Sequence, residues 1–294
     1  MHRILRHSVV LLVVASAMDT ALSRNIFWTD NDRKWIGSAN LDGSNPHILL
    51  NVGETLDGLA VDSLHGKIYW VENVNKRIGR SNIDGSNMEY ILSSSNHMST
   101  LDLDLNDGKL YWAGYGICRA NLDGTAAETV LSQSQAPARD IALDLTRGKI
   151  YWGGGTSRIG RANMDGSGAE ILSSDPAYAL ALDSEGRRLF VADWFGNKLY
   201  SVDEKGEDRR ELAVGQVLGP RDVTLYDGWV YWTQDHIQNK VLRCRPDGTQ
   251  IETVIDLGTG RGPTALVIVP EPATLSLLAL GAMEVLRHRR TRKA

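Results

Sequence analysis

The chain has 294 residues, of which 42% are hydrophobic and 23% charged, so it can bury a core and does not have the composition of a disordered protein. Its formal net charge is −4, but residues 18–269 hold 25 Lys and Arg against 34 Asp and Glu, a net charge of −9. An acidic body argues against nucleic acid as a partner, because the phosphates would repel it.

The first 17 residues, MHRILRHSVVLLVVASA, have the order of parts found in a secretory signal peptide. Arg3 and Arg6 precede an apolar stretch from Val9 to Val14, and the small residues Ala15-Ser16-Ala17 follow it. We expect cleavage after Ala17, with Ser23 as the second choice. Residues 1–17 therefore predict that the protein is exported.

The middle of the chain repeats one phrase at a fixed spacing. KIYWVENVNKRIGRSNIDGS begins at Lys67, and KIYWGGGTSRIGRANMDGS begins at Lys149. Six units result when the Trp of the Tyr-Trp pair, or the residue that replaces it, is aligned. Each unit has an Asp-Gly or Lys-Gly turn signal at the same place. The aligned positions are Trp28, Trp70, Trp112, Trp152, Val191 and Trp232. A period of about 41 residues predicts a repeat architecture.

Each aromatic pair after the first follows a short apolar segment: residues 59–62, 101–104, 141–144, 180–183 and 223–226. A sixth such segment, 266–269, ends the repeat region. Since each unit has room for four strands, residues 26–269 predict an all-β fold, a six-bladed β-propeller of four-stranded antiparallel blades. The first unit lacks an inner strand of its own, so we expect Thr264–Val269 to complete the first blade and close the ring.

The two cysteines fall in different units of this ring. Cys118 lies in the third unit and Cys244 in the sixth, on opposite sides of a six-fold arrangement. A disulfide joins Cα atoms only about 4.4–6.8 Å apart. We therefore expect both thiols to be free.

The repeated motifs IFWTD, IYWVE, LYWAG, IYWGG, LFVAD and VYWTQ resemble the YWTD, or class B, repeat of low-density-lipoprotein-receptor propellers. The resemblance covers residues 26–269. It implies that the acidic fourth position, Asp30, Glu72 and Asp193 here, helps to tie blades together. Gly114, Gly154 and Gln234 replace that carboxylate in the other units. The Tyr-Trp pairs themselves are expected in the core, because large apolar side chains at periodic positions are usually buried.

One face of the predicted ring varies more than the other. It carries the loops after the aromatic pairs and the links between units, and binding residues tend to gather on such loops. Its aromatic and polar candidates are Trp35, Tyr115, Trp194, Phe195 and His236. The resemblance adds Arg139 and Arg221, which match the position of a ligand-facing arginine in receptor propellers. The alternative is that Trp194 replaces packing lost at Val191 and that the Arg-Asp pairs are local ion pairs.

Asp102 is the odd residue of its repeat position, where the other units have Ala, Thr or Val. It is a weak candidate for a metal ligand in the central channel, since Ca²⁺ takes six to eight oxygen ligands. No motif of nucleophilic, zinc or phosphate-loop chemistry occurs in the body. We expect no cofactor. The alternative function is a metal-dependent enzyme, because lactonases are also six-bladed propellers and hold a divalent metal in the channel.

The last 25 residues combine three features in a fixed order. Pro270-Glu271-Pro272 is followed by an apolar run over residues 273–286, which Glu284 interrupts, and then by Arg287, Arg289, Arg290, Arg292 and Lys293. This order resembles the PEP-CTERM sorting signal of Gram-negative bacteria. The resemblance implies transient anchoring in the inner membrane, an exosortase-type processing enzyme, and release to the cell surface or extracellular matrix.

Together these features predict an exported, non-enzymatic propeller that binds a protein or polysaccharide at the bacterial surface.

Overall fold

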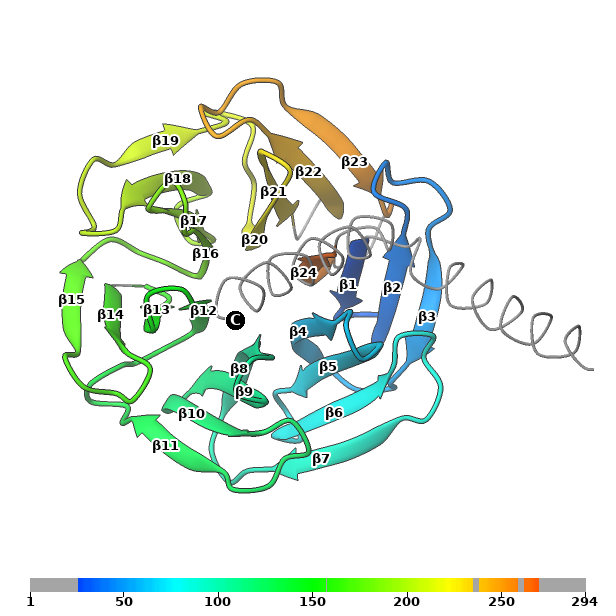
Figure 1. Ribbon diagram of the computed structural model, residues 1–294. Helices are drawn as coiled ribbons and strands as arrows, with labels where there is room; N and C mark the ends of the chain where they lie inside the picture. Colours follow the sequence, from blue (N-terminus) through cyan, green and yellow to red (C-terminus); the bar gives the residue numbers. More distant parts are fainter. Residues whose placement is uncertain (1–25, 157, 235–237, 259–261, 270–294) are drawn as a thin grey trace, which may run out of the picture.

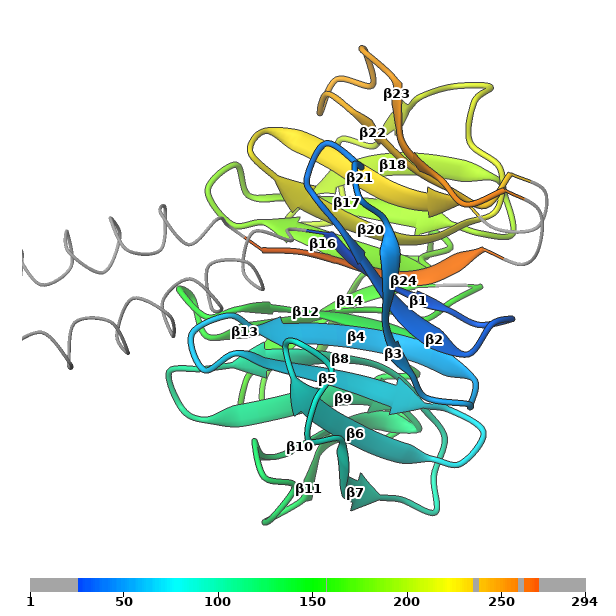
Figure 2. The ribbon, with the colours of Figure 1, turned by 90° about the vertical axis from the view of Figure 1, so that its right-hand side faces the viewer.

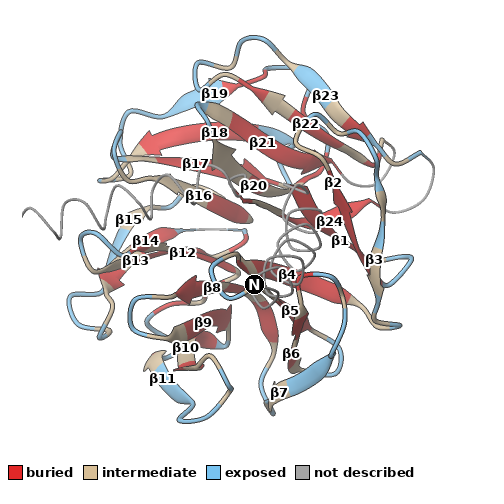
Figure 3. Cartoon of the chain, turned by 45° about the vertical axis from the view of Figure 1, so that its right-hand side comes forward, coloured by how far each residue is buried: buried red, intermediate tan, exposed pale blue. Residues whose placement is uncertain are grey.

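The predicted six-bladed ring is confirmed. A computed structural model of the chain describes residues 26–156, 158–234, 238–258 and 262–269, and all regular structure in these residues is β-strand (Figure 1). Six four-stranded antiparallel sheets surround a central channel. Figure 3 shows that the buried residues lie mainly in the three strands nearest the channel, whereas each outer strand is mainly half-buried or exposed.

Blades are numbered from the first unit, and each is given from its inner to its outer strand. Blade 1 is β24 (Pro263–Ile268), β1 (Ile26–Asp30), β2 (Trp35–Ala39) and β3 (His47–Asn51). Blade 2 is β4 (Leu56–Asp62), β5 (Lys67–Glu72), β6 (Arg77–Asn82) and β7 (Glu89–Ser93). Blade 3 is β8 (Met98–Asp104), β9 (Lys109–Gly114), β10 (Gly116–Asn121) and β11 (Glu128–Leu131).

Blade 4 is β12 (Asp140–Asp144), β13 (Lys149–Gly153), β14 (Ile159–Asn163) and β15 (Glu170–Ser173). Blade 5 is β16 (Ala179–Asp183), β17 (Arg188–Asp193), β18 (Lys198–Asp203) and β19 (Arg210–Leu212). Blade 6 is β20 (Pro220–Tyr226), β21 (Trp229–Gln234), β22 (Lys240–Cys244) and β23 (Glu252–Asp256).

The ring closes as the sequence predicts, because β24 pairs with β1 in blade 1. Trp28 lies opposite Leu266, and Ile26 lies opposite Ile268. The hydroxyl of Thr29 accepts a hydrogen bond from the backbone N–H of Ala265 at 2.9 Å. This pairing covers the backbone groups of β1 that would otherwise form an open sheet edge.

The repeated phrase Arg-Ile-Gly-Arg has a packing explanation. In blades 1, 2 and 4 a glycine lies directly opposite the unit's tryptophan on the neighbouring strand, in the pairs Trp28–Gly37, Trp70–Gly79 and Trp152–Gly160. A Cβ atom at Gly160 would lie 2.2 Å from the ring of Trp152. All three indoles are fully buried. Glycine is therefore required where the indole lies across the next strand.

The second arginine of the phrase joins neighbouring blades. Arg80, Arg119 and Arg161 each form an ion pair with the glutamate opposite on the outer strand. Their guanidinium groups also donate to a backbone carbonyl of the next blade: Leu122 at 3.0 Å, Met164 at 3.3 Å and Glu204 at 3.2 Å. Blades 2 and 3, 3 and 4, and 4 and 5 are thus joined by an arginine rather than by a carboxylate.

The acidic fourth position has another role here than the resemblance implies. Asp30 accepts hydrogen bonds from Arg33, Glu72 from Arg77, and Asp193 from the backbone N–H of Gly196. Each of these contacts lies within a single β-hairpin. The carboxylates therefore brace the loop that follows the second strand of their own blade.

Both cysteines are free, as predicted. The predicted signal peptide (1–17) and sorting signal (270–294) lie outside the described residues. Within the described residues no helix is long and apolar enough to cross a membrane.

The Trp–Gly packing predicts a specific loss of stability. Gly160→Ala should lower the free energy of unfolding by about 1–3 kcal/mol, because the added methyl group overpacks a fully buried site. Chemical denaturation measures the change. Cys118→Ala is the matched control, since Cys118 lies opposite Trp112 and already carries a side chain. Equal unfolding midpoints for wild type and Gly160→Ala would contradict this account.

Candidate functional site

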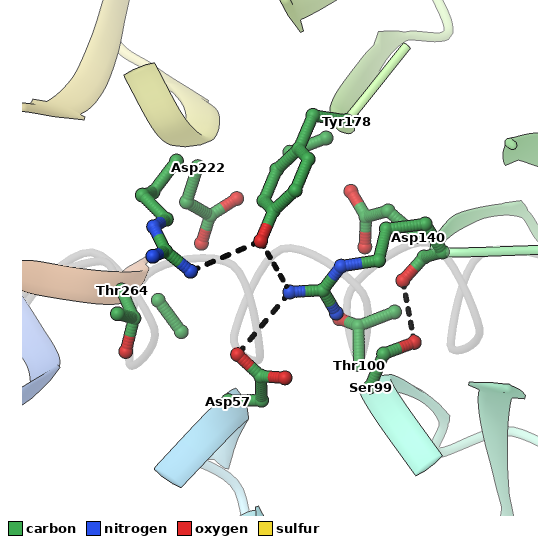
Figure 4. A pocket seen from close by; sticks show the side chains of 11 residues that line it. Asp57, Ser99, Thr100, Asp140, Tyr178, Asp222 and Thr264 are labelled. Carbon is green, nitrogen blue, oxygen red and sulfur yellow. Dashed lines mark hydrogen bonds and ion pairs between the residues drawn. The ribbon is translucent and has the colours of Figure 1, made fainter. Parts of the chain in front are cut away.

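Six residues, one from each blade, meet at one end of the central channel. They share one repeat position. In each blade the aligned Trp or Val of the second strand pairs with a residue of the inner strand, and the mouth residue lies two positions before that residue. We call them the mouth ring: Asp57, Ser99, Arg139, Tyr178, Arg221 and Thr264. All six line one pocket (Figure 4). The loops after the second strands and the links between blades open on the same side, which we call the mouth face.

Tyr178 lies between the two arginines of the mouth ring. Its hydroxyl oxygen is 2.8 Å from Nη2 of Arg139 and 3.0 Å from Nη1 of Arg221, and each guanidinium donates to it. Nη2 of Arg139 also forms an ion pair with Oδ1 of Asp57 at 3.2 Å. The other oxygen of Asp57 accepts a hydrogen bond from Asn73. These contacts join blades 2, 4, 5 and 6 across the channel mouth.

Arg139 keeps its charge although it is largely enclosed. Burial lowers its pKa, but the carboxylate of Asp57 and the hydroxyl of Tyr178 outweigh burial and raise the pKa above its ordinary value. The guanidinium carbon lies 4.6 Å from the ring centroid of Tyr178. The site thus holds a fixed positive charge against an aromatic face.

An aromatic cluster continues from Tyr178 onto the surface of the mouth face. The ring centroids of Tyr178 and Trp194 are 5.6 Å apart, and those of Trp194 and Phe195 are 4.7 Å apart with nearly perpendicular rings. Arg221 stacks on Trp194 at 5.2 Å. Phe195 is 55% exposed, which is unusual for a phenylalanine at the end of such a cluster. The structure therefore brings together four predicted residues: Arg139, Trp194, Phe195 and Arg221.

The other predicted site residues lie elsewhere. Tyr115 is exposed on the mouth face beside His97, with ring centroids 6.1 Å apart, but it does not line the pocket. Trp35 is only 8% exposed and packs edge-on against Trp28 at 6.0 Å, so it belongs to the core of blade 1. His236 lies outside the described residues.

Beneath the mouth ring, two carboxylates line both the pocket and the channel. Asp140 accepts a hydrogen bond from the backbone N–H of Leu180 at 2.7 Å, and Asp222 accepts one from that of Leu266 at 2.6 Å. Burial raises the pKa values of both, and repulsion from Asp140 adds to the rise at Asp222. The channel below them is a cavity of about 250 Å³.

Asp102 lines the same cavity and makes the same kind of contact. Its two oxygens accept hydrogen bonds from the backbone N–H groups of Leu103 at 2.8 Å and Leu143 at 3.0 Å. Burial raises the pKa of Asp102 to about 6. Among the described residues no group of three or more His, Cys, Asp or Glu side chains is placed to hold a metal ion. The residues present do not fit the metal centre of the alternative prediction.

Sequence reasoning missed Tyr178. It occupies the repeat position of Arg139 and Arg221, in the link DPAY before β16. Comparison of that single position across all six units would have found it, together with Asp57, Ser99 and Thr264.

The half-buried carboxylate of Asp102 predicts a pH dependence of stability. Because its pKa is raised in the folded protein, its favourable contribution is present at acid pH and is lost as pH rises from about 4 to about 6. Asp102→Asn should flatten the stability profile in this window. At about pH 4, where Asp102 is neutral in the folded protein, the variant should also lower the free energy of unfolding by about 1 kcal/mol, since the amide accepts at only one atom. Denaturation at a series of pH values tests this. The exposed Asp107→Asn is the control, and a profile equally steep in Asp102→Asn would contradict the assignment.

The chain matches no known protein-family model. Among solved structures it is similar to the nidogen chain of "Crystal structure of Nidogen/Laminin Complex", which is a low-density-lipoprotein-receptor-type YWTD propeller. The TM-score is 0.73 and the sequence identity 19%, over 84% of this chain and 98% of that chain. The fold of this protein is thus that of a six-bladed β-propeller.

Proposed function

We propose that this protein is an exported, non-enzymatic binding module whose ligand docks at the channel mouth. The observation that carries the proposal is the cluster in which Arg139 and Arg221 share the hydroxyl of Tyr178 beside the exposed Phe195. Arginine and aromatic side chains are the usual anchors of protein interfaces. The six inner strands hold this cluster in place, so a ligand meets preformed geometry.

A protein ligand fits this surface best. Further apolar side chains are exposed in loops and links of the mouth face: Val74, Tyr115, Val214 and Leu218. Such a rim around a charged centre suits a peptide segment with an acidic side chain, because guanidinium groups bind carboxylates well. The solved structure to which this chain is similar is itself a complex of two proteins, as its title states. A polysaccharide bearing carboxylates is the second candidate, favoured by the same two arginines.

The channel carboxylates support binding over catalysis. Both oxygens of Asp102 and of Asp222 accept hydrogen bonds from backbone N–H groups. A carboxylate used in this way holds neighbouring strands together and is poorly available as a metal ligand or general base. A lactonase-like reaction would need such groups to be available.

The proposal includes export and sorting. Residues 1–17 would direct export, and residues 270–294 would anchor the chain transiently in the inner membrane through residues 273–286 until an exosortase-type enzyme cuts it. The direction of β24 supports this arrangement. Pro263 lies opposite Asp30 near the mouth face, and Ile268 lies at the other end of the strand. β24 runs from one face of the ring toward the other (Figure 2), so an anchor after Val269 would leave the mouth face pointing away from the membrane.

Paired capture from surface and matrix extract tests the binding site. The full chain serves as bait beside Arg221→Ala/Phe195→Ala, which should weaken binding about 10- to 100-fold by removing two anchors. Arg245→Ala, a change of the same type on the opposite face, is the control. Protease or periodate treatment of the extract separates protein from polysaccharide ligands.

A partner retained equally by all three baits would exclude the channel mouth as the binding site. The three baits must have equal melting temperatures before the partners that they capture are compared.

A further inference from the structure

The internal repeat is broken at one place on the face opposite the mouth. In blades 2 to 5 the inner strand ends in an aspartate, and a four-residue loop leads to the second strand. Blade 6 has Tyr226 instead of the aspartate and a two-residue turn, Asp227-Gly228, whose φ angles are +48° and +70°. Trp229 replaces the lysine or arginine that begins the second strand in blades 2 to 5.

The shorter turn leaves a groove beside blade 5. Between blades 4 and 5, Arg147 donates to the backbone carbonyl of Ser184 at 2.8 Å and bridges the two loops. The corresponding position of blade 5 is Gly186, which has no side chain to reach blade 6. The resulting cavity of about 420 Å³, which we call the blade 5–6 groove, is lined by loop residues 183–185 and by Tyr226, Asp227 and Trp229.

The groove combines aromatic walls with an acidic rim. Glu185 and Asp227 are exposed, and neither carboxylate has a hydrogen bond or ion pair in the part of the chain that the structure describes. Asp183 contributes a third carboxylate. The indole of Trp229 already stacks with two guanidinium groups, those of Arg243 at 4.2 Å and Arg245 at 3.8 Å. The indole is thus already occupied, and the attraction for a further cationic side chain comes from the three carboxylates of the rim.

The chain leaves the propeller on the same face of the ring as this groove. β24 runs away from the mouth face, and Ile268 packs against the same hydrophobic cluster as Tyr226 and Trp229. Seventeen residues separate Val269 from Arg287, where five Lys and Arg occur within seven residues. An extended chain of that length spans up to about 56–61 Å. The basic segment is therefore long enough to reach the groove.

We propose that the blade 5–6 groove binds the basic segment 287–293 of the same chain. Charge complementarity between that segment and the three carboxylates drives the contact, and the apolar stems of its arginines pack along the groove wall. A segment held in the groove does not lie across a bilayer, so the contact competes with membrane insertion of residues 273–286. Glu284 weakens that insertion. The groove thus gives the uncut chain a second, membrane-free state.

Trypsin cleavage of the full chain tests this proposal, with intact mass reporting loss of the tail. At about 0.02 M NaCl, cleavage after residues 287–293 should be about tenfold slower in wild type than in Glu185→Gln/Asp227→Asn, because cleavage requires the undocked form. Asparagine tolerates the positive φ of position 227. Glu54→Gln, which removes a carboxylate from the mouth face, should behave as wild type. At about 0.5 M NaCl the difference should disappear.

Equal cleavage rates in wild type and the double variant at low salt would overturn the proposal. Protection that persists in both proteins at high salt would also overturn it, since that result assigns the protection to the apolar run and not to the carboxylates. Carbodiimide cross-linking gives a second measurement. Lys293 should link to Asp183, Glu185 or Asp227 in wild type, and linkage only to carboxylates of other blades would exclude the groove.

Discussion

The structure depends on how neighbouring inner strands are held around the channel. Adjacent blades are separate sheets, so no ladder of backbone hydrogen bonds joins one inner strand to the next. Side chains supply the bonds instead. Asp102, Asp140 and Asp222 each accept from a backbone N–H of the following blade, and Ser99 and Thr264 donate to carbonyls of Arg139 and Leu56. These contacts join blade 3 to 4, 4 to 5, 6 to 1 and 1 to 2, and they therefore help to hold the residues of the mouth ring in place.

That constraint explains why acidic groups lie where they are costly. Burying a carboxylate is unfavourable unless its oxygens are satisfied, and two backbone N–H groups satisfy each of Asp102 and Asp222. Burial still raises their pKa values. These carboxylates therefore make specific contacts between blades, and they also make the stability of the ring depend on pH.

Much of the fold follows from the sequence because the period, the Tyr-Trp pairs and the turn glycines all belong to local structure. Ring closure by Thr264–Val269 follows as well, since one unit lacks an inner strand and the last has one to spare. The candidate site at the channel mouth is harder to predict from the sequence. Trp35 and Trp194 both follow the acidic position of their units, yet Trp35 packs in the core and Trp194 at the mouth. Which of them faces solvent depends on loop geometry and on the bulk of neighbouring side chains.

Departures from the repeat, more than the repeat itself, locate the chemistry of this protein. A perfectly regular ring would place six identical residues at each level of the channel and leave both faces uniform. The mouth ring instead places two arginines and a tyrosine among small or acidic residues. Blade 6 has a two-residue turn and a tryptophan where blades 2 to 5 have a four-residue loop and a lysine or arginine. Both changes leave the core of their blades intact, with Trp232 and Tyr231 still buried. Selection for stability alone gives no reason to break the pattern at these two places, so the mouth ring and the blade 5–6 groove are the surfaces at which binding is to be sought.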